Sequence, residues 1–159
     1  MGQVAFYAGA YAERANKLEK ANLYFDIAMQ DPEWAEKAEN AKFEVAGKNL
    51  KTEADTLRYI GQLKDLYTQK NSEAAFSVLC KLYSSSNKTA ELNALVDDML
   101  KKNPTNFLAL AYHTQSIADA VSRQEENQNW DPAIEAYKKL LDASDKNQAF
   151  VYAGLGQCL

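Results

Sequence analysis

The sequence is poor in the residues that carry most catalytic and metal chemistry. It contains a single histidine and only two cysteines, Cys80 and Cys158, which lie far apart and outside any Cys-x-x-Cys spacing, so neither a disulfide framework nor a zinc site is indicated. His113 has Ser116 and Asp119 further along the same predicted helix, but a serine within a helix has no strained turn to expose its hydroxyl. We therefore expect no catalytic residue, no metal ligand, no cofactor and no enzymatic activity.

The chain also lacks a long apolar run and an excess of basic residues. No run of about eighteen apolar residues occurs, so no membrane insertion is expected. The net charge of -4 argues against a nucleic-acid partner, because phosphate neutralisation needs clustered lysine and arginine. The apolar stretch near the start follows no basic residue and is interpreted as helix, not as a signal peptide. We predict a soluble protein, and leave its compartment open between cytoplasm and periplasm.

Glycine and proline are scarce, with six and three residues respectively. No segment of alternating apolar and polar residues is flanked by hairpin turn residues, so no strand is predicted. Each proline follows a residue type that favours the N-cap of a helix, in the pairs Asp31-Pro32, Asn103-Pro104 and Asp131-Pro132. We predict that all three pairs mark helix starts.

Apolar residues recur at three-and-four spacing, which is typical of helices with one buried face. The polar breaks between these segments are short, so consecutive helices are expected to turn back as antiparallel neighbours. The one longer polar connection covers residues 122–129. An apolar content of 47% in 159 residues is enough for one sizeable core, and we predict a single helical domain over residues 1–159. The predicted helices cover residues 3–15, 17–30, 33–47, 53–70, 72–85, 89–102, 104–122, 131–143 and 147–159.

The clearest internal unit runs from Phe76 to Pro104, with a turn at Asn87 between two helices. Its first helix carries a large residue, a leucine, a small residue and an aromatic at helical spacing: Phe76, Leu79, Cys80 and Tyr83. This pattern resembles the tetratricopeptide repeat (TPR), a helix pair of about 34 residues. The helix over 131–143 is also very similar to the second helix of that repeat.

The resemblance covers the whole chain as four helix pairs and one unpaired last helix, with the weakest match between Pro32 and Asn71. It implies an all-α, right-handed superhelix, a TPR-like solenoid of about nine antiparallel helices. Neither end resembles a polar cap, so we expect the chain to be a section of a longer array or to associate through its end helices. Small residues are expected where helices cross closely, at Gly9, Ala21, Ala28 and Ala133.

The resemblance also implies a function, because TPR arrays bind a peptide or a helix from another protein in a concave groove lined by the first helix of each pair. The matching positions of this sequence are Phe6, Ala10, Glu39, Phe43, Ser77, Lys81, Ala111 and Gln115. The family's clamp for acidic chaperone tails is not matched, since Phe6, Ala10 and Ala74 replace its lysine and asparagine residues and only Asn40 fits. A neutral, partly aromatic groove favours a peptide held by apolar anchors.

Two other functions remain open from the sequence. The chain could be a structural or assembly module that associates through its end helices, including as a homo-oligomer. It could also be the regulatory repeat section of a larger enzyme whose catalytic residues lie elsewhere.

Overall fold

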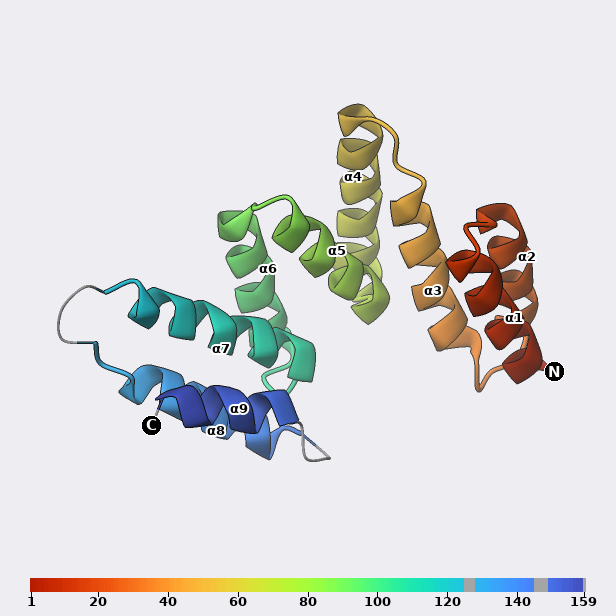
Figure 1. The fold of residues 1–159 in the computed structure, drawn as a ribbon. Helices are drawn as coiled ribbons and strands as arrows, with labels where there is room; N and C mark the ends of the chain where they lie inside the picture. Colours follow the sequence, from red (N-terminus) through yellow and green to blue (C-terminus); the bar gives the residue numbers. More distant parts are fainter. Residues whose placement is uncertain (125–127, 145–148, 159) are drawn as a thin grey trace. The chain divides into compact units, whose positions relative to one another are not determined.

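The computed structural model describes residues 1–124, 128–144 and 149–158, and the part described is helical without any strand (Figure 1). Every predicted segment corresponds to one helix, and no bound that can be compared differs by more than three residues. Residues 147, 148 and 159 of the last predicted segment lie outside the described ranges. The all-α prediction is therefore confirmed over the described ranges. The helices are α1 Gly2–Arg14, α2 Leu18–Ala28, α3 Ala35–Lys48, α4 Glu53–Lys70, α5 Glu73–Ser85, α6 Thr89–Lys102, α7 Phe107–Ser122, α8 Asp131–Asp142 and α9 Ala149–Cys158.

Local side-chain chemistry places the helix ends. Thr52 caps α4, because its hydroxyl oxygen accepts a hydrogen bond from the Asp55 N–H at 3.1 Å. At three turns between helices an asparagine takes a left-handed backbone conformation, a conformation that few other residues with a side chain tolerate. These are Asn16, Asn71 and Asn87, with φ of 56°, 49° and 55°. The turn predicted at Asn87 is thus confirmed.

The prediction that every proline starts a helix is wrong for Pro104. The helix α7 begins at Phe107, and its N-cap is Asn106, whose Oδ1 accepts from the Ala109 N–H at 2.9 Å. The side chain of Asn103 instead closes the preceding turn. The proline therefore lies in a turn that leads into the helix.

Pro32 is displaced from its helix start in the same way, because α3 begins only at Ala35. The Asp31 carboxylate accepts hydrogen bonds from the Glu33 N–H at 3.2 Å and from the Gly2 N–H at 3.0 Å. Asp31 thus closes its own turn and also binds the otherwise unpaired first turn of α1. Only Pro132 lies in the first turn of its helix, α8, as predicted.

The helices fall into two compact units, Met1–Ser85 and Ser86–Leu159. The first unit contains α1 to α5, and the second contains α6 to α9. The boundary lies within the predicted repeat from Phe76 to Pro104. The prediction of a single domain stays a prediction.

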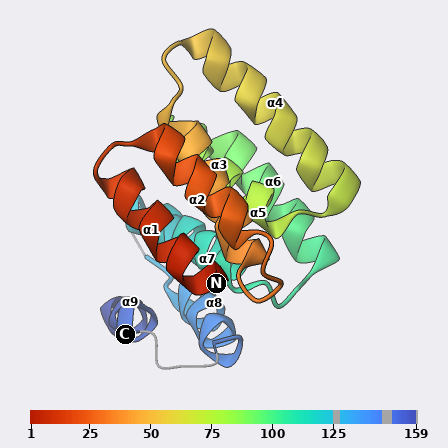
Figure 2. The same cartoon turned by 90° about the vertical axis from the view of Figure 1, so that its right-hand side faces the viewer.

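In the first unit, α1 and α2 lie side by side (Figure 2) because small residues occupy their crossing. Gly9 has no side chain, and a Cβ atom there would lie 2.5 Å from Cε1 of the fully buried Phe25. Ala21 and Ala28 are also completely buried in this core, which α3 completes with Ala38 and Val45. The expected role of small residues at the crossing is confirmed for these positions.

The helix α3 contacts α1 and α2 on one side and α5 on the other. The long helix α4 packs mainly against α5, and it reaches α3 through Tyr59, whose hydroxyl donates to the Phe43 carbonyl at 2.6 Å. The predicted pair between Pro32 and Asn71 is therefore less closely packed than α1 with α2. This is also the stretch where the repeat pattern is weakest.

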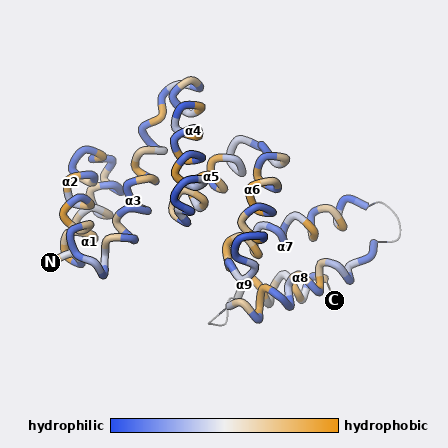
Figure 3. The backbone as a smooth tube through the Cα atoms, turned by 180° about the vertical axis from the view of Figure 1, so that it is seen from behind, coloured by the Kyte–Doolittle hydropathy of each residue, from blue (hydrophilic) through white to orange (hydrophobic). Residues whose placement is uncertain are grey.

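In the second unit, each helix packs on the next in chain order from α6 to α9. The core lies between α7, α8 and α9, around Tyr137, Leu140 and Val151. The helix α9, which has no partner in the repeat pattern, packs on α8. Its Gly154 lies so close that a Cβ atom there would meet the Tyr137 ring at 2.4 Å. Apolar and polar stretches alternate along the helices of both units (Figure 3), as their one-sided burial requires.

Candidate functional site

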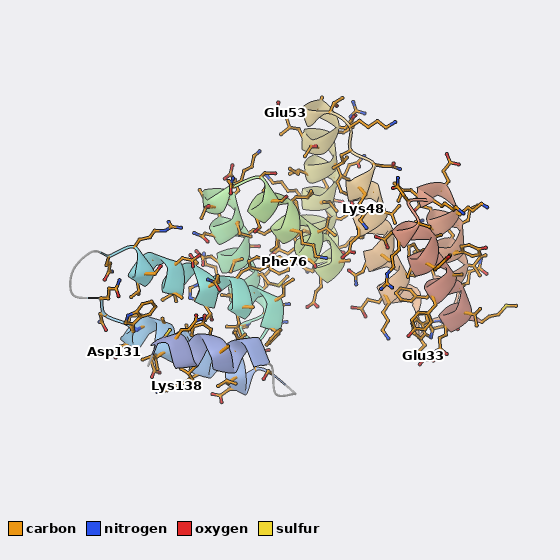
Figure 4. The ribbon with its side chains drawn as sticks, in the orientation of Figure 1. Glu33, Lys48, Glu53, Phe76, Asp131 and Lys138 are labelled. Atoms are coloured by element: carbon orange, nitrogen blue, oxygen red, sulfur yellow. The ribbon has the colours of Figure 1, made fainter. Side chains whose placement is uncertain are left out.

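The first helices of the predicted pairs, α1, α3 and α5, are neighbours in that order within the first unit. Ion pairs join each to the next: Lys48 of α3 binds Glu13 of α1, and Lys81 of α5 binds Glu44 of α3. Lys48 lies at the end of α3 (Figure 4). We call α1, α3 and α5 the first-helix row. Both partners of the Lys81–Glu44 pair are exposed, and such a pair contributes at most about 1 kcal/mol, whereas Glu13 is largely covered.

Four aromatic rings gather where α1 meets the start of α3. The Phe6 ring lies 5.7 Å from that of Phe25 and 5.2 Å from that of Trp34, measured between centroids. Tyr7 lies 5.8 Å from Trp34, and the Lys37 ammonium lies 4.4 Å from the centre of the Trp34 ring. A cation at this distance is attracted by the ring, and it leaves a positive charge beside the cluster. We call Phe6, Tyr7, Phe25 and Trp34 the aromatic cluster.

The six predicted groove residues of the first unit occupy different environments. Phe6 is half-buried in the aromatic cluster, while Ala10 and Ser77 are half-buried on α1 and α5. Lys81 is exposed and forms an ion pair with Glu44 of α3.

The two candidates on α3 differ from each other. Glu39 is exposed and Phe43 is half-buried. The Phe43 carbonyl accepts a hydrogen bond from the Tyr59 hydroxyl of α4, so α4 also contacts this part of α3.

The other two candidates, Ala111 and Gln115, belong to α7 in the second unit. Ala111 packs against the core of that unit. The Gln115 side-chain amide donates to the Asp119 carboxylate at 2.7 Å. One candidate is thus engaged in packing, and the other in a hydrogen bond on its own helix.

A surface that the sequence pattern did not single out lies on α1. Val4, Tyr7 and Tyr11 remain 75%, 58% and 76% exposed, and exposed large apolar side chains that lie together can mark an interaction surface. Their spacing of three and four residues places them on one face of the helix. That spacing could have identified an apolar face from the sequence, but it does not distinguish an exposed face from a buried one. We call these three residues the α1 stripe.

Two residues weighed for chemistry in the sequence, Cys80 and Asp119, have other contacts in the structure. Cys80 is completely buried, and burial raises the pKa of its thiol to about 12, as expected for a packing residue. The Asp119 carboxylate accepts from Gln115. Among the residues with described positions, no group of histidine, cysteine and acidic side chains could hold a metal ion. Over the same residues, no helix is long and apolar enough to cross a membrane.

Comparison with known proteins adds no family to this description. No protein-family model matches the sequence, and no curated protein matches it either. Any functional assignment therefore depends on the chain's own residues.

Proposed function

We propose that the chain is a non-catalytic scaffold of TPR-like helix pairs, which binds a peptide or a helix of another protein along the first-helix row. The observation that carries this proposal is the α1 stripe, which shares Tyr7 with the aromatic cluster. Large apolar side chains left in water cost free energy, and a partner that covers them recovers about 25 cal/mol for each Å². The resemblance to TPR arrays supports the same helix row as the binding surface.

The surface favours a partner with apolar anchors and few charges. Tyr7 and Tyr11 present aromatic rings with hydroxyl groups, which contribute apolar area and can also hydrogen-bond to a peptide. Two lysines further along the row are already paired within the chain, Lys48 with Glu13 and Lys81 with Glu44. An acidic tail would therefore meet few free cations there, whereas Leu, Met or aromatic side chains would find the stripe uncovered.

A library of displayed peptides tests this proposal, because selection from it requires no identified partner. We expect enriched sequences rich in apolar residues, with an affinity for the wild-type chain that falls about tenfold or more in Tyr11→Ser, as for a central aromatic contact. The control is Leu57→Ser, which removes another exposed apolar side chain, 53% exposed, from α4. Equal loss in both variants, or no enrichment at all, would contradict the proposed site.

A second function has its own supporting observation. The helix α2 leaves Leu23 and Ile27 exposed by 63% and 45%, four residues apart on one face. Such a face suits an assembly module in which helices of two chains cover each other. Sedimentation at increasing concentration tests this alternative: association that Leu23→Lys abolishes would favour it, and a monomer at all concentrations would exclude it.

A further inference from the structure

The second unit contains a cleft that the peptide-binding proposal does not use. It lies between α6, α7 and α8 and has a volume of about 450 Å³. Pockets that hold small molecules typically measure about 300–1,000 Å³, so the cleft is large enough for one such ligand. Every residue that lines it belongs to the second unit, so a ligand here is independent of the function of α1, α3 and α5.

The interior of the cleft is mainly apolar. Leu110 and Ile117 of α7, Leu100 of α6 and Ala136 of α8 all line it. Among the lining residues, Thr114 carries a buried hydroxyl, which donates to the Ala136 carbonyl at 3.4 Å. The cleft therefore presents hydrocarbon to a ligand over most of its wall.

The walls also offer few hydrogen-bond partners for a peptide backbone. The backbone groups of helices bind one another, and two lining residues, Pro104 and Pro132, have no N–H to donate. A peptide inserted here would leave several of its own N–H and C=O groups unpaired, each at a cost of about 1–3 kcal/mol. A ligand with an alkyl chain and a single polar end avoids that cost.

The charges at the cleft favour an anion at that polar end. Glu135 and Lys139 stand one turn apart on α8, and Glu135 is already paired with Lys138 at 3.0 Å. Lys139 makes no ion pair with any residue of the described ranges. The helix that carries these residues runs from Asp131 past Lys138, both labelled in Figure 4. One uncompensated ammonium group beside an apolar cavity suits one carboxylate.

We propose that the cleft between α6, α7 and α8 binds a medium-chain aliphatic carboxylate. The carboxylate pairs with the Lys139 ammonium. The alkyl chain lies on Leu110 and Ile117. His113, which also lines the cleft, stands beside the bound chain.

The single histidine provides a site-specific reporter, because its imidazole C–H signals are the only ones of their kind in the proton NMR spectrum. We expect octanoate, added to the full chain at constant pH, to shift the His113 signals to saturation. Octanamide has the same chain without the charge, and we expect it to bind about tenfold more weakly. Equal affinity for both, or no saturable shift with octanoate, would overturn the proposal.

Two variants test the role assigned to Lys139. We expect Lys139→Met to weaken octanoate binding about tenfold, since it removes the charge-assisted pair. Lys101→Met is the matched control, because it removes an exposed lysine of the same unit that does not line the cleft, and we expect its affinity within about twofold of wild type. Equal weakening in both variants would indicate a non-specific effect of net charge and overturn the assignment.

A last binding experiment distinguishes two possible ligands of the cleft, a small carboxylate and the carboxyl terminus of a partner protein. A short peptide that ends in leucine with a free carboxylate presents the same charge and a similar apolar group. We expect it to bind more weakly than octanoate, because its backbone groups find no partners in the cleft. Tighter binding of the peptide would overturn the proposal in favour of a chain terminus as the occupant.

Discussion

Two glycines on different helices should respond to alanine with opposite signs. Alanine is better than glycine in a helix by about 0.8–1 kcal/mol. Gly61 of α4 has nothing within 4 Å of an added Cβ, so Gly61→Ala should stabilise the protein by nearly that amount. At Gly9 the Cβ would lie 2.5 Å from Phe25 Cε1 and 2.7 Å from its Cδ1.

The cost at Gly9 depends on the burial of the ring that the new Cβ would meet. Phe25 is fully buried, so it cannot swing into solvent, and either the ring or the two helices must shift. Overpacking of this kind costs about 1–3 kcal/mol. After the gain in helix propensity is subtracted, Gly9→Ala should destabilise the first unit by about 1 kcal/mol. The difference between the two variants isolates the steric cost.

The assay needs a signal from the first unit alone, because a chain with two units need not unfold in one step. Each unit contains one tryptophan, so a Trp130→Phe background leaves Trp34 as the sole tryptophan, placed beside Phe6 in the aromatic cluster. Excitation at a wavelength that tyrosine does not absorb then reports on Trp34 alone. Urea unfolding followed by Trp34 fluorescence then gives the free energy for each variant. If Gly9→Ala stabilises as much as Gly61→Ala does, the close crossing of α1 and α2 is refuted.

Three further predictions concern a thiol, a cap and an ion pair. Burial raises the pKa of Cys80 to about 12 from 9.0, so above pH 9 the unfolded thiol loses a proton that the folded thiol retains. The contribution of this thiol to the free energy of unfolding is therefore complete below pH 9, and it falls by at most about 1.4 kcal/mol per pH unit as the pH rises towards 12. Urea unfolding at a series of pH values should show that the free energy of unfolding of Cys80→Ala falls less steeply with pH than that of the wild type. Thr52→Ala should cost about 1 kcal/mol in urea unfolding through loss of the α4 cap, whereas Thr68→Ala, at an exposed position within the same helix, should not destabilise. Lys81→Met should change the unfolding free energy by less than about 1 kcal/mol, because both partners of its ion pair are largely exposed, and a larger loss would show that the pair does more than order the row.

Most of the helix pattern could be predicted from the sequence because it depends on local chemistry. Apolar spacing identifies each helix, and polar turns with an asparagine, as at Asn71 and Asn87, separate them. The prolines were less reliable, because an N-cap residue such as Asn103 can also close a turn outside the helix. Several residues in such a turn have suitable side chains, and only the packing selects between Asn103 and Asn106 as the cap.

The arrangement of the helices was less predictable because it depends on contacts between distant residues. The repeat pattern pairs α4 with α3, whereas the structure packs α4 mainly on α5. The α1 stripe has the spacing of a buried face, so only the structure shows it exposed. The cleft depends on α6, α7 and α8 together, and no single segment contains both His113 and Lys139, which line it.

Hydrogen exchange of the full chain, with and without the tightest peptide from the display selection, tests most directly whether the first-helix row binds a peptide. We expect slower exchange in α1 and α3, centred on the segments that carry the α1 stripe and Trp34, and the Tyr11→Ser variant should lose most of that protection. Protection confined to α6 through α9, or protection that Tyr11→Ser leaves unchanged, would contradict peptide binding on the first-helix row.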